Sequence, residues 1–528
     1  MARPSLGGLL GGLGRRMLGL GSADAVDPRS PSALEAGSTR RRLSVWQPIQ
    51  QHINAAMYAA GPNATARARW LVRNNGYAKA ALRSWSAATV GPGIKPSSLL
   101  ADPVLRNAVN QAWLDWTDEA DAEGLTDFYG LARRVAREAF IAGEVFIRLR
   151  PRLPQDRLSV PLQLQMLPSE QLPLSKIEEA PNGNPIRMGV EFDRNLREKR
   201  VAYWFYRVNP SDTTLTFLEA MQAGQLTRVP ASEVIHVFDP VEAGQIRGLT
   251  GYQAAMVKLF QMDLYDDAEL ERKKQIARYA AFVTTPAPSP DEIAAGLLRG
   301  DDGNPLEPRP QDDAIHYGPG SVVTLYPGED VKFSEPGEVG GSYEPFQYRT
   351  LLQITAALGV PYGELSGDLS KATYASSRAG LLAFRQEVEA FQHGVLVFLF
   401  LRHVWTRWMD AAVLAGRLPI TAAAYNADPT KWRRMKAITP RMPWVDPLKD
   451  RQANALALRI GAVAPQDVIE AEGYDAEETL DRWQEWIAML AARELPGFDY
   501  GWSARAAGGA PAAATDGGAE QQNAGAAA

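Results

Sequence analysis

The order of apolar and polar residues divides the first part of the chain into helical stretches. Helix-forming residues run from 47 to 86 and stop at Val90-Gly91-Pro92-Gly93, a strong helix breaker. Apolar residues at helical spacing predict further helices over 103–116 and 128–142. We therefore expect the folded part of the chain to begin with helices.

After these helices the pattern changes from a helical to an alternating period. Val145, Ile147 and Leu149 alternate with their neighbours, and residues 162–166 alternate leucine or methionine with glutamine, as in half-buried strands. Strands are also predicted over 201–208 and 234–238, and Asn182-Gly183 is a hairpin-turn signal. Residues 46–250 are therefore predicted to form one body in a helix-rich α+β fold.

A helix predicted over 250–279 carries charge on nearly every face. Its apolar stripe consists of Tyr252, Met256, Leu259 and Phe260, the same face continues as Asp263, Asp267 and Lys274, and the opposite face carries Lys258, Glu269 and Arg272. Acidic residues cluster early and basic residues late, which matches the helix macrodipole. Two interpretations stay open: a solvated helix stabilised by its own charges, and a projecting helix that pairs subunits.

The region that follows this helix is predicted to be an irregular insert closed by a second helix. Residues 283–342 are interrupted by many prolines and glycines, with a short strand predicted over 321–325. The second helix begins at Glu344, and Gly359 and Pro361 signal its end. Its apolar side is predicted to contain Phe346, Leu351, Ile354 and Leu358. Two helices around such an insert suggest a stalk with a cap.

The rest of the chain is predicted to contain a loop, one long helix and a few short helices. The loop, 361–375, consists mainly of small polar residues with a single lysine, Lys371. Apolar residues mostly at three- and four-residue steps predict a helix over 376–414, buried on all faces around 395–401. These apolar positions are Leu381, Phe384, Val388, Phe391, Val395, Phe398 and Trp405. Two or three short helices are predicted over 447–493, and both tails are expected to be disordered.

Composition and charge narrow the range of functions. A formal net charge of −5 and a pI near 5.8 argue against a protein that grips nucleic acid by bulk attraction. The absence of cysteine excludes disulfides and thiolate chemistry, and five histidines leave little for zinc sites. No apolar run approaches the ~18 residues of a membrane span, and the N-terminal segment lacks the order of a secretory signal. A cytoplasmic protein, or one assembled from cytoplasmic material, is expected.

A search for catalytic motifs finds almost nothing. The sequence has no phosphate-binding P-loop, dinucleotide-binding glycine motif, nucleophile elbow or zinc-protease motif. His236, with Asp239 nearby, is expected to be a satisfied structural histidine rather than a metal ligand. We expect no catalytic residue, no cofactor and no metal.

The alternative is a metal-dependent nuclease or packaging enzyme that uses paired acids. Such pairs occur at Asp266-Asp267, Asp301-Asp302 and Asp312-Asp313. A two-metal site needs converging carboxylates on rigid elements, whereas adjacent carboxylates on a helix point in different directions. Solvated charge is therefore the preferred interpretation.

Three tryptophan pairs lie at i, i+3 on predicted helices. They are Trp113/Trp116, Trp405/Trp408 and Trp483/Trp486. Stacking on nucleic-acid bases is normally accompanied by a basic groove, and none is evident in the sequence. Packing in a core or an interface is therefore expected for all three pairs.

A series of short motifs occurs in a specific order between residues 65 and 490. In chain order they are Arg69-Trp70-Leu71-Val72-Arg73-Asn74-Asn75-Gly76, Val90-Gly91-Pro92-Gly93, Trp113-Leu114-Asp115-Trp116, Gly143-Glu144, Gln245-Ile246-Arg247-Gly248, Tyr343-Glu344-Pro345-Phe346, Leu358-Gly359-Val360-Pro361-Tyr362, Tyr374-Ala375-Ser376-Ser377-Arg378 and Trp444-Val445-Asp446-Pro447-Leu448-Lys449. In this order they resemble the lambda-type portal proteins of tailed bacteriophages. The tails and residues 285–340 carry no such motif.

The resemblance implies a twelve-fold ring at one capsid vertex, built from wing, stem, clip and crown around a central channel. Its implied map of this chain is a wing at 46–250, stem helices at 251–282 and 343–360 around a clip at 283–342, a channel loop at 361–375, a long wing helix with its following segment at 376–446, and a crown at 447–495, between disordered tails at 1–45 and 496–528. Double-stranded DNA would pass through the channel, driven by a separate motor.

The resemblance also implies partners and a location. It implies a homo-oligomer that contacts the terminase large subunit, the major capsid and scaffold proteins, a head–tail adaptor and double-stranded DNA, with no membrane. The protein would be a non-enzymatic component of the virion, assembled in the host cytoplasm. Net negative charge suits a conduit, because each neutralised phosphate adds affinity that translocation must break. A capsid or tail adaptor without a DNA channel is the structural alternative.

Because a ring repeats each channel residue in every subunit, the hypothesis of a DNA-facing channel surface depends on a few side chains. Lys371 is expected to face DNA, with Ser370 and Thr373 beside it, and the alternative is an ordinary exposed lysine. Belts of stem charge are expected from Asp263, Asp267, Glu269, Lys273 and Lys274. The motifs imply structural roles for Arg73, Asn74, Gly91, Gly93, Arg247, Gly248, Tyr343, Glu344, Gly359, Pro361, Ser376, Ser377, Arg378, Asp446 and Pro447.

Overall fold

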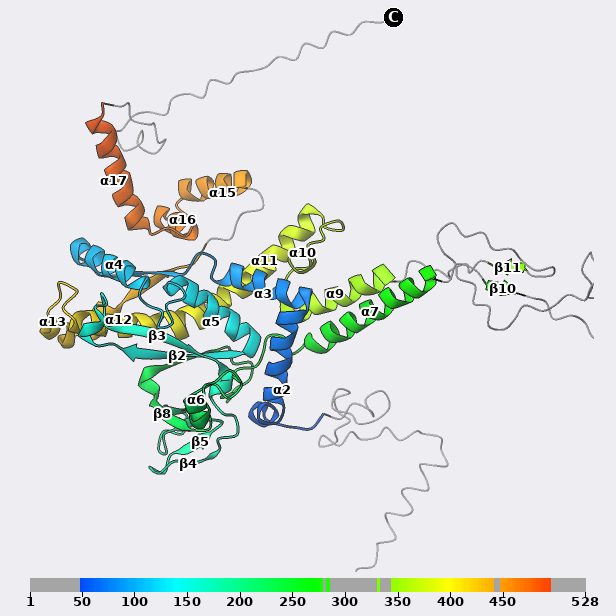
Figure 1. Ribbon diagram of the computed structural model, residues 1–528. Coiled ribbons are helices and arrows are strands. Elements are labelled where there is room, and N and C mark those ends of the chain that lie inside the picture. The colour runs from blue at the N-terminus through cyan, green and yellow to red at the C-terminus, as the bar shows by residue number, and fades with distance from the viewer. Residues whose placement is uncertain (1–47, 279–281, 285–329, 333–342, 441–446, 495–528) are drawn as a thin grey trace, which may run out of the picture. The chain divides into compact units, whose positions relative to one another are not determined.

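The computed structural model describes residues 48–278, 282–284, 330–332, 343–440 and 447–494 (Figure 1). Contacts divide the chain into two compact units, 1–59 and 60–528, and every described helix and strand after residue 75 lies in the second. Helices dominate the described residues and small sheets accompany them, so the helix-rich α+β prediction is confirmed. The two tails, the strand predicted at 321–325 and nearly all of the predicted clip lie outside the described residues.

The helix-forming stretch 47–86 contains two helices, α2 (Ile53–Asn74) and α3 (Gly76–Thr89). Asn75 separates them with an extended backbone, and its side-chain oxygen accepts a hydrogen bond from the Ala78 N–H at 3.0 Å. A side chain that caps one helix in this way also ends the preceding one. The division therefore depends on a single asparagine within the first motif.

The next two helices, α4 (Pro103–Thr117) and α5 (Phe128–Ala142), agree with the predictions to within one residue. Asp102 caps α4 by accepting from the Val104 N–H at 2.9 Å, and Asp127 caps α5 by accepting from the Gly130 N–H at 2.7 Å. Helix α5 ends at Gly143, whose φ of 87° favours glycine.

A three-stranded antiparallel sheet follows α5. The three predicted strands are present, and the structure places β2 (Glu144–Pro151) between β3 (Leu162–Leu167) and β9 (Val234–Phe238). Val145 and Ile147 of β2 belong to one apolar cluster with α5, whereas Phe146 between them belongs to another. Strand β2 is therefore covered on both faces.

A second antiparallel sheet contributes to the cluster around Phe146. Its strands, in sheet order, are β4 (Glu178–Glu179), β5 (Pro185–Arg187), β6 (Val190–Phe192), β7 (Arg200–Tyr206) and β8 (Leu226–Pro230). The predicted turn at Asn182-Gly183 joins β4 to β5, with Gly183 at a φ of 77°. A short helix, α6 (Phe217–Gln222), separates β7 from β8.

The long helix predicted over 376–414 is present and widens in its centre. It consists of α11 (Tyr374–Phe391), a π-helical segment (Gln392–Leu401) and α12 (Arg402–Leu414). Phe398 is an exception to the predicted burial on all faces, because its side chain is half exposed. The helix therefore keeps one side open even in its most apolar stretch.

Two of the three tryptophan pairs form the centre of the largest core. Trp113 and Trp116 of α4 pack against Trp405 and Trp408 of α12, and the Trp113 ring centroid lies 5.1 Å from each of the latter two rings. The core-packing prediction is confirmed for these pairs. Trp483 and Trp486 of the third pair remain partly exposed, so they are not core residues, and packing in an interface stays a prediction for them.

The last part of the described chain contains a small sheet and short helices. Strand β1 (Lys95–Ser98) pairs with β12 (Met435–Ile438), and α13 (Ala422–Ala427) and α14 (Pro429–Arg433) precede β12. The predicted C-terminal helices are α15 (Pro447–Arg459), α16 (Pro465–Ala471) and α17 (Ala476–Ala492). Lys436 of β12 forms ion pairs with Glu470 at 2.6 Å and Asp475 at 3.4 Å.

Short elements complete the fold. Single 3₁₀ turns occur at Pro154–Asp156, Ser169–Gln171 and Ala231–Glu233, and β10 (Phe282–Thr284) pairs with β11 (Asp330–Lys332). Among the helices within the described ranges, none combines the length and apolar character that a bilayer crossing requires.

Candidate functional site

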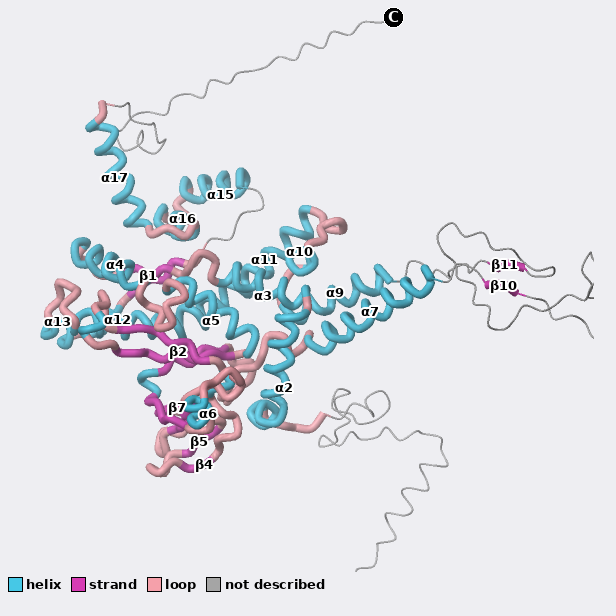
Figure 2. The backbone as a smooth tube through the Cα atoms, viewed as in Figure 1, coloured by secondary structure: helices cyan, strands magenta, loops and turns pink. Residues whose placement is uncertain are grey.

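The two helices at the positions predicted for the stem, α7 (Met256–Arg278) and α9 (Tyr343–Leu358), lie side by side (Figures 1 and 2). Helix α7 begins at Met256 rather than at 250, because residues 250–255 form turns in which the Tyr252 hydroxyl donates to the Ala78 carbonyl at 2.7 Å. The N-terminal half of α7 and the C-terminal half of α9 share an apolar cluster with α3 and α5. Its buried members from the pair are Met256, Leu259, Met262, Leu351, Ile354 and Leu358.

The far half of the pair is held together by polar and aromatic contacts. The Tyr343 hydroxyl of α9 donates to Asp266 of α7 at 2.9 Å, and the Tyr343 ring stacks on Tyr265 with centroids 5.9 Å apart. The Lys273 ammonium lies 5.4 Å from the centre of the Tyr343 ring. Burial and the Asp266 carboxylate together raise the pKa of Tyr343 to about 12. Tyr343, a motif residue, therefore fixes the spacing of the two helices.

One side of α7 carries a partly exposed apolar stripe, of which Phe260 makes an edge contact with Trp70 of α2, their ring centroids 6.1 Å apart. Val257, Phe260 and Leu264 are 60, 47 and 54 % exposed. Because each helical residue turns the chain by about 100°, the three side chains fall within about 60° of one another. Of the predicted apolar stripe, Tyr252, Met256 and Leu259 are buried together with Met262, whereas Phe260 is half exposed. Phe346, on the predicted apolar side of α9, is also half exposed.

The predicted belt residues of α7 lie at different depths. Asp263 and Glu269 are partly buried, whereas Asp267, Lys273 and Lys274 are exposed. Glu269 pairs with Arg272 at 3.4 Å and Glu271 with Lys274 at 2.8 Å, both as i, i+3 pairs on the same helix. Such pairs contribute only about 0.2–0.5 kcal/mol each. The helix therefore gains little stability from its own charges.

The segment 361–375 is not the uninterrupted loop that the sequence predicts. It contains a short helix, α10 (Tyr362–Ser366), which ends at Gly367 with a φ of 73°, and α11 already begins at Tyr374. Thr373 caps α11: its N–H donates to the Ser376 hydroxyl at 3.0 Å, and its own hydroxyl accepts from the Ser376 N–H at 3.2 Å. Thr373 and Ser376 thus have a helix-starting role that the loop prediction did not include.

Lys371 contacts the α9 helix. Its ammonium lies 2.9 Å from a Glu344 carboxylate oxygen and 4.3 Å from the centre of the Tyr348 ring, and the side chain is half exposed. The hydrogen bond to Glu344 raises the pKa of Lys371. Ser370 nearby donates its N–H to Asp368 at 2.8 Å. The structure thus joins two predicted residues, Lys371 and Glu344, whose contact no pattern in the sequence indicated.

A buried ionic network lies just before α7. Its centre is Glu144, the first residue of β2, which accepts from Arg247 Nε at 2.8 Å and from the Gly248 N–H at 2.8 Å. The His236 ring nitrogen Nε2 lies 2.9 Å from the same carboxylate. Each of these three partners comes from a different part of the chain than Glu144, so the network joins β2, β9 and the segment that leads to α7.

Arg247 also holds the loops beneath the sheets. Its guanidinium donates to the carbonyls of Leu172 and Met188, both at 2.9 Å, and of Ser169 at 3.1 Å. Gly248 packs so closely that a β-carbon there would lie 2.1 Å from the Gly143 carbonyl oxygen. Two of the motifs, Gly143-Glu144 and Gln245-Ile246-Arg247-Gly248, are therefore halves of one structural feature.

The protonation states of the network follow from its burial. Burial lowers the pKa of His236 to about 4 despite the adjacent Glu144 carboxylate. Burial alone would raise the pKa of Glu144, but Arg247 and His236 lower it to about 2. At neutral pH the ring is therefore neutral, with Nε2–H donating to Glu144 and Nδ1 accepting from Arg200 at 2.8 Å. Because both ring nitrogens are engaged, the expectation of a structural histidine is confirmed.

Other motif residues have mainly conformational roles. Gly91, Gly93 and Gly359 have positive φ angles, and at Gly93 the Tyr129 ring leaves no room for a β-carbon. Pro361 precedes α10, and Pro447 begins α15. The Ser377 N–H donates to the Thr373 carbonyl at 2.9 Å in the first turn of α11. Arg378 of α11 forms an ion pair with Asp450 of α15 at 3.4 Å. Arg73 and Asn74 are exposed at the end of α2, and Asp446 lies outside the described residues.

The paired acids do not assemble a metal site in the part of the chain that the structure describes. Asp266 is engaged by Tyr343 and Gln347, and Asp267 is exposed beside it. Across the described ranges, no three carboxylate or imidazole side chains are placed to bind one ion. The other two acidic pairs, Asp301-Asp302 and Asp312-Asp313, lie outside those ranges.

Sequence reasoning missed two arrangements. The first is the role of Glu144 as the partner of both Arg247 and His236; a charged residue directly after the helix-ending Gly143, at the start of an apolar strand, was the available signal. The second is the exposed stripe of Val257, Phe260 and Leu264, which spacing alone could not separate from the buried face.

Comparison with known proteins gives consistent matches. Residues 39–392 match the model described as phage portal protein, lambda family. The chain is 28% identical to the probable portal protein of Halomonas phage phiHAP-1, covering 84% of this chain and 83% of that protein. It is 23% identical to portal protein B of Escherichia phage lambda, covering 83% and 85% respectively.

A solved structure is also similar. A chain from the neck of an empty gene transfer agent particle is 16% identical, with 82% of this chain and 98% of that chain covered and a TM-score of 0.39. The family model spans well over half of the 528 residues. The chain therefore belongs to the lambda family of phage portal proteins, which are structural, non-enzymatic components of the phage particle.

Proposed function

We propose that this chain closes into a ring of twelve copies around a channel through which double-stranded DNA is packaged and ejected. The observation that carries the proposal is the exposed stripe of Val257, Phe260 and Leu264 on a helix already paired with α9. A soluble chain rarely leaves such a stripe open unless another surface covers it. A neighbouring copy of the same helix pair provides that surface.

Within the ring, the parts of the chain take the places implied by the sequence. Residues 46–250 and 376–446 form the wing, α7 and α9 the stem, 283–342 the clip, 361–375 the channel loop and 447–495 the crown. The network of Glu144, Arg247 and His236 supports this division, because it fixes the segment that leads from the wing sheets into α7.

The channel surface is proposed to repel DNA more than it binds it. Asp263, Asp267 and Glu269 would repeat around the ring as acidic belts, with Lys273 and Lys274 further along the stem. Lys371, beside Ser370 and Thr373, is the proposed DNA contact, and its ion pair with Glu344 limits how strongly it attracts phosphate. A partly neutralised lysine suits a conduit in which every contact must also break.

The proposed partners follow the stages of particle assembly. In the host cytoplasm the ring would be incorporated at one capsid vertex through the major capsid and scaffold proteins. The clip would then bind the terminase large subunit during packaging and a head–tail adaptor afterwards. Because the family is structural and non-enzymatic, the alternative of a nuclease or packaging enzyme is excluded.

Electron microscopy of the purified full-length protein, with symmetry determination, tests the proposal. We expect a perforated ring of twelve copies, which the paired change Phe260→Asp and Leu264→Asp reduces to smaller species. Phe217→Asp, at an exposed phenylalanine of α6, is the matched control and should leave the ring intact. A filled assembly would indicate the adaptor alternative, and a wild-type protein that stays monomeric would contradict the proposal.

A further inference from the structure

Strand β12 has one free edge in the described part of the chain, where it pairs with β1 alone. The Leu99 N–H donates to the Arg434 carbonyl at 3.1 Å, which makes this pair a hydrogen-bonded one. Hydrogen-bonded pairs alternate along an antiparallel ladder, so Lys436 also bonds to β1, whereas Met435 and Ala437 direct their N–H and C=O groups to the other edge.

Pro96 gives independent support for this assignment. It lies opposite Ala437 in the ladder and has no N–H to donate. Proline is accepted in a strand only where its nitrogen faces away from the partner. The pair of Pro96 and Ala437 is therefore a non-bonded one, and the free edge of β12 begins at Met435 and continues through Ala437.

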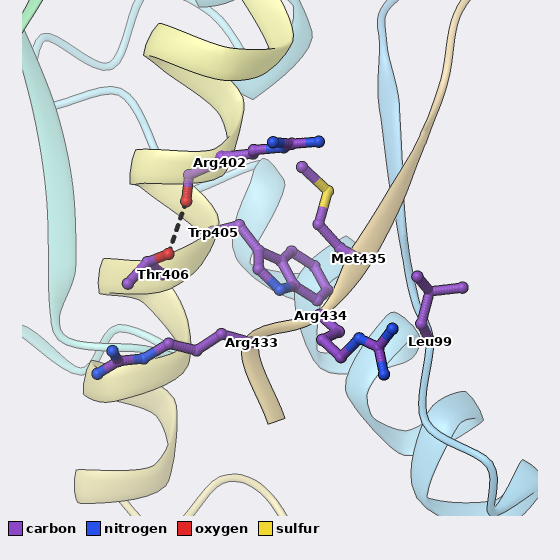
Figure 3. Close-up of a pocket in the computed structure, with 7 residues that line it drawn as sticks. All are labelled: Leu99, Arg402, Trp405, Thr406, Arg433, Arg434 and Met435. Carbon is purple, nitrogen blue, oxygen red and sulfur yellow. Dashed lines mark hydrogen bonds between the residues drawn. The ribbon is translucent and has the colours of Figure 1, made fainter. Parts of the chain in front are cut away.

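This free edge faces a groove between β12 and the helix that carries Arg402, Trp405 and Thr406 (Figure 3). Two hollows of about 260 and 230 Å³ share Arg402 and Met435. The first also reaches Leu99 beside β1, and the second is lined by Lys436, Ala437 and Thr439. We call the two adjoining hollows together the β12 groove.

Some basic side chains in the β12 groove have carboxylate partners, and others do not. Arg433 pairs with Asp410 at 2.6 Å and extends away from Met435 in Figure 3, and Lys436 pairs with Glu470. Glu389, which lines the second hollow, pairs with Arg385 of its own helix at 2.7 Å, and neither Arg402 nor Arg434 forms an ion pair within the described residues. The groove therefore presents two uncompensated guanidinium groups next to an unpaired strand edge.

We propose that the β12 groove binds an extended, acidic segment of another protein, which adds to β12 as a further strand. Its main chain would pair with Met435 and Ala437, and its carboxylates would bind Arg402 and Arg434. Peptide is favoured over DNA because the free edge offers N–H and C=O groups at the two-residue spacing of a strand. The proposal goes beyond the portal role and does not depend on ring closure.

The binding test uses synthetic peptides on the full-length protein. The probe is a fluorescent, blocked hexapeptide of alternating valine and glutamate. A second peptide replaces each glutamate by glutamine, and a third carries N-methyl groups on alternate backbone nitrogens. We expect the glutamine peptide to bind at least about tenfold more weakly, and the N-methylated peptide, with one set of edge donors blocked, to bind similarly weakly or not at all.

Two protein variants locate the binding. The double variant Arg402→Gln, Arg434→Gln should bind the acidic peptide as weakly as the wild-type protein binds the glutamine peptide. Arg83→Gln, at an exposed arginine of α3, should leave binding of the acidic peptide unchanged. Ala437→Pro removes an edge donor without removing a bond to β1, and should abolish binding. Circular dichroism checks that this variant is folded, and the N-methylated peptide tests the same point without any variant.

Residue-resolved amide exchange gives the clearest readout. In the free protein the Lys436 amide should exchange slowly and the Met435 and Ala437 amides fast, and the acidic peptide should slow only the latter two. Equal binding of the three peptides, or no binding, would overturn the proposal. It would also be overturned if duplex DNA bound through Arg402 and Arg434 while the peptide did not, or if Ala437→Pro only changed self-association.

Discussion

Charged residues occur in two contrasting settings in this chain, the network of Glu144, Arg247 and His236 and the far half of α7. In the network, every charged group is buried and has its partners within the same chain. Along α7, charges are mostly exposed, the ion pairs join residues one turn apart, and Asp266 and Lys273 contact Tyr343 of α9. Phe260 and Leu264 remain about half exposed.

The difference shows which region is complete in one copy. A buried carboxylate without its partner is strongly destabilising, so the network must be satisfied before the chain is stable alone. An exposed apolar stripe destabilises a single chain much less than an unpaired buried carboxylate does. It contributes favourable free energy only when another surface covers it. The first region therefore stabilises the subunit, and the second is available for assembly.

The largest expected effect comes from breaking the network. Arg247→Met leaves Glu144 buried without its counter-ion and should lower the free energy of unfolding by about 3–5 kcal/mol. Chemical denaturation of the full-length protein measures this loss. Arg207→Met, at an arginine whose guanidinium donates to the Thr227 hydroxyl at the surface, is the control and should change little. A loss below about 1 kcal/mol for Arg247→Met would show that the network is not what holds the subunit.

Acid should weaken the network next. The pKa of His236 is about 4 in the folded chain against an ordinary value of 6.5, so the unfolded chain binds more protons between these limits. This stabilisation is fully present above pH 6.5 and is lost as the pH falls toward 4, by about 3 kcal/mol. Denaturation midpoints across this range measure the slope. The variant His236→Gln should show a smaller slope of stability against pH. An equal slope in the variant would mean that groups other than His236 cause the loss.

A smaller effect is expected where α7 meets α9. Tyr343→Phe removes the hydroxyl that donates to Asp266 but keeps the ring stacked on Tyr265. The loss of one such hydrogen bond should cost about 1 kcal/mol. Thermal melting of the variant measures it, with Tyr206→Phe on β7 as a comparison for loss of a phenol hydroxyl elsewhere. No change at Tyr343 would mean that packing alone sets the helix spacing.

The smallest effect on folding is expected at Lys371. Its ion pair with Glu344 is exposed, so Lys371→Gln and Glu344→Gln should leave the melting temperature unchanged. The two variants should differ in DNA packaging: loss of Lys371 removes positive charge, whereas loss of Glu344 frees it. Packaged genomes per particle measure this, with Lys79→Gln as an exposed control. Identical packaging in all three would remove Lys371 from the channel hypothesis.

Much of the fold could be predicted because its signals are local. Helix α5 and strand β9 agree with their predicted bounds, since apolar period, caps and turn residues lie within a few positions of each element. The burial predicted for Phe398 was wrong and the exposure of Phe260 could not be predicted, because an apolar residue beside a buried stripe is buried only if a neighbour packs there. Helix α10 was missed because five residues of mixed character give no period.

The sequence alone determined the family, the order of elements and the motif residues, because these depend on residue identity and on spacing along the chain. Only the tertiary structure decided that Glu144, His236 and Arg247 meet, that Lys371 rests on Glu344 and that one edge of β12 stays open. These facts join residues tens to more than a hundred positions apart. Such contacts are set by how preformed elements pack, and no local pattern in a single sequence records them.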